Sequence, residues 1–219
     1  MTDLQKEWIA SVIALAKPRT NTTEASLRFM AESFLDAHAR TPGGLSVEVG
    51  TWWGGSALMF LELLEWIYPA AERPMLFTID PYGNKPYFGG DVTIFGGLYG
   101  DEDFVRMKRL LAGYAAHAHW YCRGIEFFGV APGLCYWQRG KGKLIEGLTF
   151  VFLDGDHDHA SIAREISLVL PRLAVGGAIV IDNVDKDPET VGSLTCYSPE
   201  YGPERTPGAL QARIIKSEP

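Results

Sequence analysis

The sequence of 219 residues has few cysteines, no long uninterrupted hydrophobic run and no surplus of positive charge. Its three cysteines, Cys122, Cys135 and Cys196, are widely spaced and form no Cys-x-x-Cys pair. We therefore expect reduced thiols and neither a zinc site nor a disulfide framework. The longest apolar stretch, residues 57–68, is interrupted by two glutamates, so we expect no membrane-spanning segment and no membrane partner.

The charge balance bears on partners and location. Lys and Arg number 20 against 27 Asp and Glu, a formal net charge of −7. No broad basic surface is therefore expected to neutralise a phosphate backbone, which argues against nucleic acid as a partner. The first 20 residues lack the basic segment and long apolar core of a secretory signal, so we expect a cytoplasmic protein. Its aromatic residues and N-terminal helices are compatible with a homo-oligomer.

The spacing of apolar residues predicts alternating helices and strands. Helices are expected at residues 3–16, 23–39, 55–68 and 101–115, and a fifth is expected to start at Asp156 and Asp158 and to carry an apolar stripe from Ile162 to Leu173. Asn21 and Thr22 are candidate caps of the second helix, Pro171 is expected to kink the last turn of the fifth, and Gly176-Gly177 to end it. Strands are expected at residues 45–49, 75–79, 119–122, 148–153 and 178–181, with a late edge strand at 210–215.

This alternation predicts a doubly wound, mainly parallel, Rossmann-like α/β sheet with helices on both faces. Within one domain, residues 1–219, we expect an N-terminal helical segment (1–42), a cofactor-binding core (43–184) and a C-terminal loop and edge strand (185–219). Two stretches rich in Gly, Pro and Tyr, residues 82–100 and 184–208, are expected to be long loops.

Acidic residues stand at or beside the carboxyl ends of four expected strands: Glu48, Asp80, Asp154 and Asp182. In open parallel sheets, ligands bind in the crevice beyond these ends. The sequence therefore predicts a binding site there.

The segment VEVGTWWGGS, residues 47–56, is a glycine-containing loop between a strand and a helix. Its spacing departs from GxGxxG, and Glu48 would repel a pyrophosphate, so a cationic or zwitterionic cofactor is favoured. A carboxylate at Asp80 suits the two hydroxyls of a ribose, and Tyr82 is placed to cover an adenine ring. The predicted cofactor contacts are Glu48, Gly50, Thr51, Gly54, Ser56, Asp80, Tyr82 and Asp154.

Three segments, VEVGTWWGGSALMF, FTIDPYG and FVFLDGDHDHASIAREISLVLPRLAVGGAIVIDNV, resemble class I S-adenosylmethionine-dependent methyltransferases. They are similar to the small O-methyltransferase branch that includes macrocin-type and cephalosporin-hydroxylase-like proteins. The resemblance runs from about residue 23 to 184 and implies S-adenosylmethionine as cofactor, with its amino-acid end near Glu48 and Gly50 and its ribose on Asp80. Residues 82–100 and the part after Val184 depart from that branch, the first by its length and the second by its brevity.

The segments LDGDHDH and IDNV end two strands that the fold should place side by side, which would bring together Asp154, Asp182 and Asn183. Two carboxylates and an amide carbonyl are ligands suited to Mg²⁺ or Ca²⁺. Catechol-type O-methyltransferases have a similar arrangement, which implies a divalent-metal site on these residues. His157 is then the predicted general base and Asp154 a catalytic residue.

Other interpretations of these residues stay open. Asp182 and Asn183 can form an Asx turn, and an aspartate at 156 or 158 can cap the following helix. We therefore hold metal-assisted O-methylation of a small hydroxylated molecule, a phenol or a sugar of a secondary metabolite, as the first hypothesis. The alternatives are N-methylation, a nicotinamide-dependent Rossmann oxidoreductase, and a non-catalytic cofactor-binding or assembly module.

Overall fold

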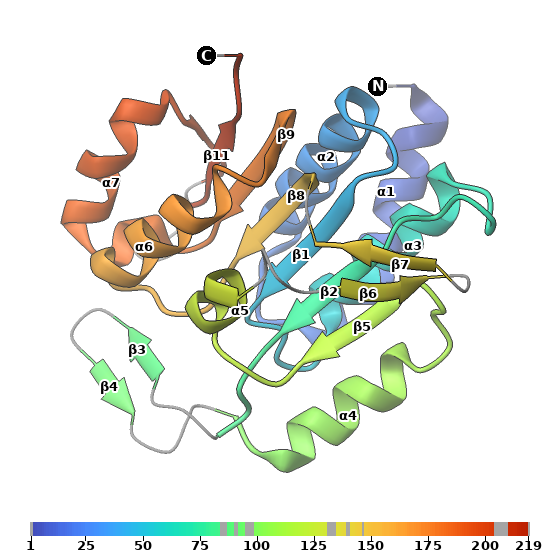
Figure 1. Ribbon diagram of the computed structural model, residues 1–219, viewed down its shortest axis with the longest axis horizontal. Helices are drawn as coiled ribbons and strands as arrows, with labels where there is room; N and C mark the ends of the chain where they lie inside the picture. Colours follow the sequence, from blue (N-terminus) through green and yellow to red (C-terminus); the bar gives the residue numbers. More distant parts are fainter. Residues whose placement is uncertain are drawn as a thin grey trace.

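The computed structural model describes residues 2–83, 87–89, 92–94, 99–130, 135–138, 141–145, 147–203 and 210–218. A seven-stranded sheet, in the order β10-β11-β9-β8-β1-β2-β5, forms its centre (Figure 1). Its strands are β1 (Leu45–Val49), β2 (Leu76–Ile79), β5 (His117–Trp120), β8 (Leu148–Leu153), β9 (Leu173–Ile181), β10 (Glu200–Tyr201) and β11 (Ala212–Ile215). The five strands from β9 to β5 are parallel, whereas β11 runs antiparallel to both its neighbours. The predicted fold class is confirmed.

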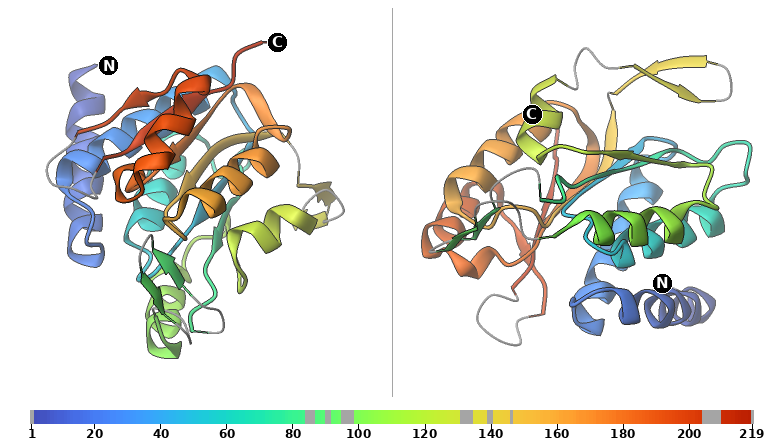
Figure 2. Two further views of the ribbon diagram at one scale, coloured as in Figure 1. Left: turned by 90° about the vertical axis from the view of Figure 1, so that its left-hand side faces the viewer. Right: turned by 90° about the horizontal axis from the view of Figure 1, so that it is seen from below.

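Helices cover both faces of the sheet (Figure 2). The helices α1 (Asp3–Ala16), α2 (Glu24–Arg40), α3 (Gly55–Ile67) and α4 (Asp101–Leu111) share one core with the sheet, and α5 (Gly124–Val130), α6 (His159–Val169) and α7 (Pro188–Leu194) pack against the other face. The alternation of side chains along a strand explains the division. In β8, Phe150 and Phe152 belong to the first core, and Val151 and Leu153 to the second.

Polar side chains cap the N-termini of α2 and α6, and the cap of α2 differs from the prediction. The side chain of Thr23 accepts a hydrogen bond from the Ser26 N–H and begins α2, so the predicted caps Asn21 and Thr22 were wrong. Asp158 caps α6 by accepting from the Ser161 N–H at 3.0 Å. This is one of the two positions expected to do so.

The end of α6 also differs from the prediction. The helix ends at Val169, so Pro171 lies beyond it and does not kink it. Gly176 and Gly177 lie inside β9, which is nine residues long and begins before the expected strand. Apolar residues at 173–181 therefore belong to a buried strand, which periodicity alone does not separate from a helix end.

Two further predicted elements have other bounds in the structure. The helix expected at 101–115 ends at Leu111, and the strand expected at 119–122 is β5, two residues earlier. The Thr78 hydroxyl lies 2.8 Å from ring nitrogens of both His117 and His119, which holds these histidines against β2. Both histidines lie within β5, next to β2.

The C-terminal part is more ordered than the expected loop. Residues 184–203 contain two 3-10 turns (Val184–Lys186 and Thr195–Tyr197), α7 and β10, and β11 lies between β10 and β9. The edge strand is thus β10 and not β11. Within the two expected loops, residues 84–86, 90–91, 95–98 and 204–208 lie outside the described residues.

Two short hairpins lie outside the main sheet: β3 (Tyr87–Gly89) with β4 (Val92–Ile94), and β6 (Cys135–Gln138) with β7 (Lys141–Leu144). None of the helices in the described ranges is both long and apolar enough to cross a membrane.

Candidate active site

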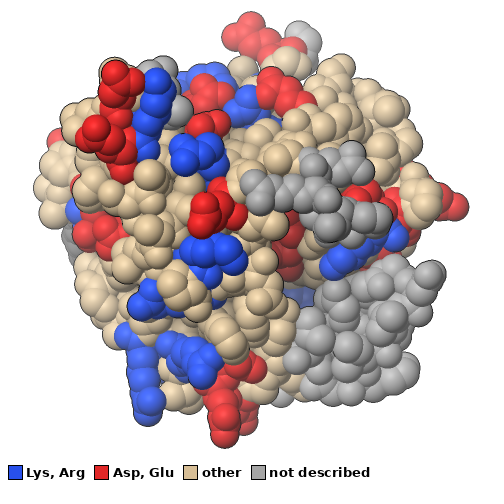
Figure 3. Space-filling model, turned by 180° about the vertical axis from the view of Figure 1, so that it is seen from behind, with Lys and Arg blue, Asp and Glu red and all other residues tan. Residues whose placement is uncertain are grey.

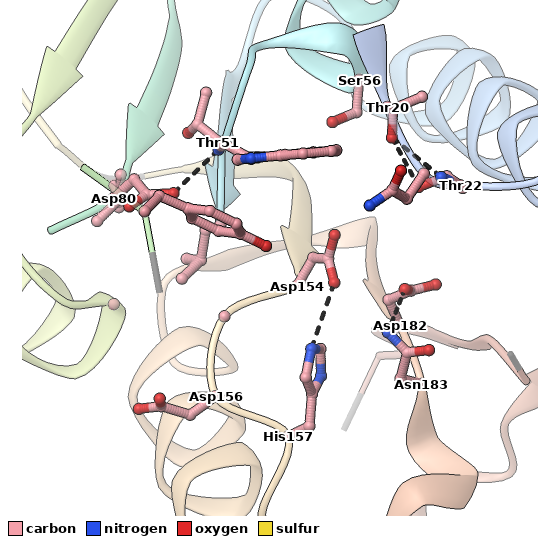
Figure 4. A pocket seen from close by; sticks show the side chains of 18 of the residues that line it. Thr20, Thr22, Thr51, Ser56, Asp80, Asp154, Asp156, His157, Asp182 and Asn183 are labelled. Atoms are coloured by element: carbon pink, nitrogen blue, oxygen red, sulfur yellow. Dashed lines mark hydrogen bonds and ion pairs between the residues drawn. The ribbon is translucent and has the colours of Figure 1, made fainter. Parts of the chain in front are cut away.

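The predicted strand ends meet at a cavity of about 450 Å³. It lies beyond the carboxyl ends of β1, β2, β8 and β9, which are neighbours in the sheet. Asp80, Asp154 and Asp182 line it, and Figure 4 shows Asp154 pointing into it, with Asp80 and Asp182 on opposite sides. Glu48, one residue before the end of β1, is fully buried and is not part of the lining.

The loop after β1 approaches the loop after β8 so closely that one position requires glycine. Gly50 has a φ of +86°, and a Cβ there would lie 1.9 Å from the carbonyl oxygen of Asp154. Thr51 and Ser56 line the cavity (Figure 4). Gly54 instead begins α3 and packs toward Met107, away from the cavity lining.

The first turn of α3 has no capping side chain and lies at the cavity. Gly54 has no side-chain hydrogen bond to the helix, and Gly55 and Ser56 of the first turn line the cavity. Free N–H groups and the helix dipole at such an end favour a negatively charged ligand group. This end of α3 suits a carboxylate.

Asp80 connects the loops that follow β1 and β2. One carboxylate oxygen accepts from the Trp52 N–H at 2.9 Å and the other from the Tyr82 N–H at 3.0 Å. Burial raises the pKa of Asp80, and these backbone N–H groups oppose the rise. A carboxylate has about four lone-pair positions, so two remain for ligand hydroxyls.

The Tyr82 ring is part of the wall and is only 2% exposed. Its hydroxyl donates to the Trp52 carbonyl oxygen at 2.5 Å, and its ring packs near Phe104 and His119. Trp52 stacks on Trp53 with ring centroids 4.1 Å apart, and Trp52 also lines the cavity. The aromatic residues therefore pack against one another beside the loop that follows β1.

Glu48 lies behind the loop without a hydrogen-bonded partner for either carboxylate oxygen among the described residues. Burial raises its pKa to about 8; the charge of Asp80 adds to the rise, and the nearby hydroxyls of Ser56 and Thr51 oppose it. A nearby cation would stabilise the ionised form of this buried carboxyl group.

His157 and Asp154 form a pair at the end of β8. His157 Nε2 lies 3.7 Å from Asp154 Oδ1 (Figure 4). Burial, and secondarily the charge of Lys186, lowers the pKa of His157 to about 3, so its imidazole is neutral at physiological pH. Burial and the charges of Asp182 and Glu48 raise the pKa of Asp154 well above its usual value.

Asp182 and Asn183 follow β9 directly, as predicted, beside Asp154. One oxygen of Asp182 accepts from Gln211 Nε2 and the other from Asn183 Nδ2, each at 2.6 Å. Asn183 has a φ of +54°, in the left-handed region that asparagine tolerates. Gln211 was missed because nothing local marks it, and only the pairing of β11 with β9 brings it here.

The N-terminal segment supplies a further wall that the sequence did not indicate. Thr20, Asn21, Thr22 and Thr23, between α1 and α2, line the cavity, and the Thr20 and Thr22 hydroxyls lie 3.0 Å apart (Figure 4). A Cβ at Gly55 would lie 2.6 Å from the Arg19 carbonyl oxygen, so this segment packs closely on α3. The site thus has hydroxyl and amide groups facing its carboxylates.

Residue types that bind metals, and thiols, occur in the described ranges. Among the described residues, no group of three His, Cys, Asp or Glu side chains is placed to hold a metal ion. Cys122 is partly buried and Cys196 is exposed, and the side chain of Cys135 lies outside what the structure describes.

Known proteins are similar to this chain at the level of domain and fold. A sequence family described as a methyltransferase domain matches residues 47–184, well over half of the chain. No curated protein sequence matches it. Among solved structures, the O-methyltransferase NovP is 12% identical with a TM-score of 0.59, covering 98% of each chain.

Two other solved structures illustrate the range of this fold. A Streptococcus mutans protein in complex with S-adenosylhomocysteine is 10% identical with a TM-score of 0.55, covering 87% of this chain and 97% of that one. An rRNA methylase from Streptococcus thermophilus is 12% identical with a TM-score of 0.53, covering 87% and 95%. At these identities the likeness concerns the fold.

A Rossmann-like sheet with an acidic, glycine-containing site at its strand ends, together with this match, defines an S-adenosylmethionine-dependent methyltransferase. The chain belongs to the methyltransferase domain family that matches residues 47–184. This membership favours methyl transfer over the nicotinamide-dependent alternative.

Proposed function

We propose that this methyltransferase transfers the methyl group of S-adenosylmethionine to a hydroxyl oxygen of a small molecule, and that a divalent cation assists. The observation that carries the proposal is the meeting of Asp154, Asp182 and Asn183 beside His157, next to the glycine loop after β1. N-methylation would not require this oxygen-rich corner.

The cofactor is assigned to the ends of β1 and β2. The first turn of α3, near Ser56 and Thr51, would hold its carboxylate, and Glu48 would face its cationic groups across Gly50. The remaining lone pairs of Asp80 would accept hydrogen bonds from its ribose hydroxyls. This places the methyl group toward β8 and β9, where Asp154 and Asp182 lie.

The oxygen groups at the ends of β8 and β9 fit a hard divalent cation such as Mg²⁺. Asp154 and Asp182 are neighbouring carboxyl groups whose burial raises both pKa values, and a cation would stabilise their ionised forms. Gln211 already orients Asp182, as an outer partner of a ligating carboxylate does. Asn183 would complete the set by turning its amide, because its nitrogen now faces Asp182.

When bound, the cation would lower the pKa of the acceptor hydroxyl and hold its oxygen in place. The acceptor oxygen would attack the methyl carbon, and the carbon–sulfur bond would break with its electron pair kept by sulfur, which gives S-adenosylhomocysteine. His157 is neutral and is assigned as the proton acceptor. Since its pKa is about 3, it takes a proton only from a strongly acidified hydroxyl.

A small acceptor is supported by the surface charge. The chain has a net charge of −7, and the face shown in Figure 3 mixes both signs of charge without a broad basic area among the described residues. Phosphate-backbone binding depends on such an area. The polar wall at Thr20–Thr23 offers hydrogen-bonding groups to a hydroxylated molecule.

The test is calorimetric titration with S-adenosylmethionine and S-adenosylhomocysteine, with Mg²⁺ or with a chelator, and with NAD as control ligand. We expect S-adenosylhomocysteine to bind and NAD not to bind. Methyl transfer is then assayed with a panel of phenols, sugars and amines as acceptors. Transfer to amines only would refute O-methylation. Transfer that the chelator does not affect would refute the role of the metal. No transfer to any acceptor would favour a non-catalytic module.

A further inference from the structure

Lys186 is a cationic residue in the wall of the cavity that neither the predicted site nor the proposed mechanism uses. It is the last residue of the 3-10 turn Val184–Lys186, which follows Asp182 and Asn183 directly. It therefore lies at the β9 end of the cavity, with β8 and β1 between it and Asp80 at the end of β2. The residue is exposed and also lines the cavity, so it lies at the cavity mouth.

The turn that carries Lys186 is held in place by the residues before it. Val184 is fully buried, and the Asp185 carboxylate accepts a hydrogen bond from the Leu210 N–H at 3.0 Å. The Lys186 N–H donates to the Asn183 carbonyl oxygen at 3.1 Å. The backbone is thus fixed at the cavity wall, whereas the flexible stem of a lysine lets its ammonium group approach a ligand.

Three cationic side chains of the described residues line the cavity: Arg19, Arg123 and Lys186. Arg19 Nη1 donates to the Leu15 carbonyl oxygen at 2.5 Å, and Arg123 Nη2 donates to Asp156 at 2.5 Å. The ammonium group of Lys186 has no hydrogen bond or ion pair within the described part of the chain. Its charge is therefore available to a ligand.

This charge acts on the corner where the acceptor is proposed to react. Burial raises the pKa values of Asp154 and Asp182 and lowers that of His157, and in all three the Lys186 charge acts to lower the pKa. Because such an effect weakens with distance, the ammonium group lies near this corner, in which Figure 4 shows the three side chains together. A divalent cation on the two aspartates would balance their charges and leave that of Lys186 unbalanced.

We propose that Lys186 recognises a negatively charged group of the acceptor, so that the preferred acceptor is a hydroxy acid. Its hydroxyl would lie at Asp154 and Asp182, and its carboxylate would reach Lys186 at the cavity mouth. The inference rests on the proposed function and narrows its substrate class from phenols and sugars to their acids. An ammonium group pairs with a carboxylate as a point charge, without one fixed orientation.

The test compares acids with neutral amides of the same size. Binding of dihydroxybenzoate and dihydroxybenzamide, and of glucuronate and glucuronamide, is measured by calorimetry on protein loaded with S-adenosylhomocysteine and Mg²⁺. We expect the wild-type protein to prefer at least one acid over its amide by about 3- to 5-fold, as for an ion pair that stays in contact with water. In Lys186→Met this preference should fall below about 1.5-fold.

Two control variants separate the charge of Lys186 from a general effect. Lys186→Arg keeps the positive charge and should keep the preference for the acid. Lys141→Met removes an exposed lysine of β7, outside the cavity lining, and should leave the preference at its wild-type value. Higher salt should reduce the preference of the wild-type protein, because the contact is exposed to solvent. Circular dichroism checks that each variant is folded.

The outcomes distinguish this inference from the proposed function. Equal binding of acids and amides by the wild-type protein, or a preference that persists in Lys186→Met, would overturn the contact while S-adenosylhomocysteine binding and methyl transfer stand. An equal change for acids and amides in Lys186→Met, with tighter Mg²⁺ binding, would also overturn it, because the lysine would then only balance the charges of Asp154 and Asp182. Failure of the wild-type protein to bind S-adenosylhomocysteine would overturn both. A preference lost in Lys186→Met and kept in Lys186→Arg supports the proposal.

Discussion

The buried carboxyl group of Glu48 should make the ligand-free protein less stable as pH rises, and Glu48→Gln should remove this effect. Burial raises the pKa of Glu48 from its ordinary value of 4.5 to about 8. The folded state therefore holds a proton that the unfolded state loses between these two pH values. The stability that this proton contributes is fully present below pH 4.5 and is lost as pH rises through 8.

The magnitude follows from the shift in pKa. Each unit corresponds to about 1.4 kcal/mol, so the full loss is about 5 kcal/mol, and about 3 kcal/mol of it falls between pH 5 and pH 8. The amide introduced by Glu48→Gln would carry no charge at any pH. The free energy of unfolding of this variant, relative to wild type, should thus rise by about 3 kcal/mol over this range.

Urea unfolding of the ligand-free protein, followed by far-ultraviolet circular dichroism at pH 5, 6, 7 and 8, measures this difference. Glu72→Gln, which removes the same group from an exposed position, controls for the substitution itself. The same Glu48→Gln variant should bind the cationic S-adenosylmethionine more weakly while being more stable. A stability difference that does not change with pH would refute the account of Glu48 as a buried acid with a raised pKa.

Three further predictions concern the loops and the metal. Asp80→Ala should reduce S-adenosylhomocysteine affinity by about 100-fold or more, measured by calorimetry, because two hydrogen bonds to a carboxylate are lost, while circular dichroism shows a folded protein; unchanged affinity would contradict the ribose assignment. Gly50→Ala should lower the free energy of unfolding by about 3 kcal/mol or more, since alanine is strained at positive φ and its Cβ would overlap the Asp154 carbonyl oxygen, whereas Gly113→Ala, with open space around it, should change little. Asp182→Ala should leave S-adenosylhomocysteine binding intact and remove any dependence of methyl transfer on Mg²⁺; an unfolded variant would instead favour a structural role for this residue.

Local sequence patterns predicted the strands and the acidic residues at their ends correctly, because neighbouring residues along the chain decide these features. The apolar runs in residues 45–49 and 148–153 predicted β1 and β8, and the acidic residues at the strand ends were correctly placed at one edge of the sheet. Parallel strands bring their carboxyl ends together whatever the loops do, so Asp80, Asp154 and Asp182 met as expected.

Predictions failed where one local sequence pattern is compatible with two kinds of secondary structure. The apolar residues from 173 to 181 suited both a helix end and a strand, and Pro171 marked only that the helix had already ended. The stretch after residue 184 is rich in turn-forming residues, yet it forms α7 and β10 because Val184 and Leu194 pack into the core beside β9.

The sequence by itself determined the fold class, the strand–glycine loop–helix unit and the carboxylates at the strand ends, because periodicity and residue chemistry act over short distances. Only the tertiary structure decided which groups surround them. Thr20 and Thr22 reach the cavity because α1 and α2 pack on α3, and Gln211 because β11 pairs with β9. Such contacts between distant parts of the chain leave no local pattern.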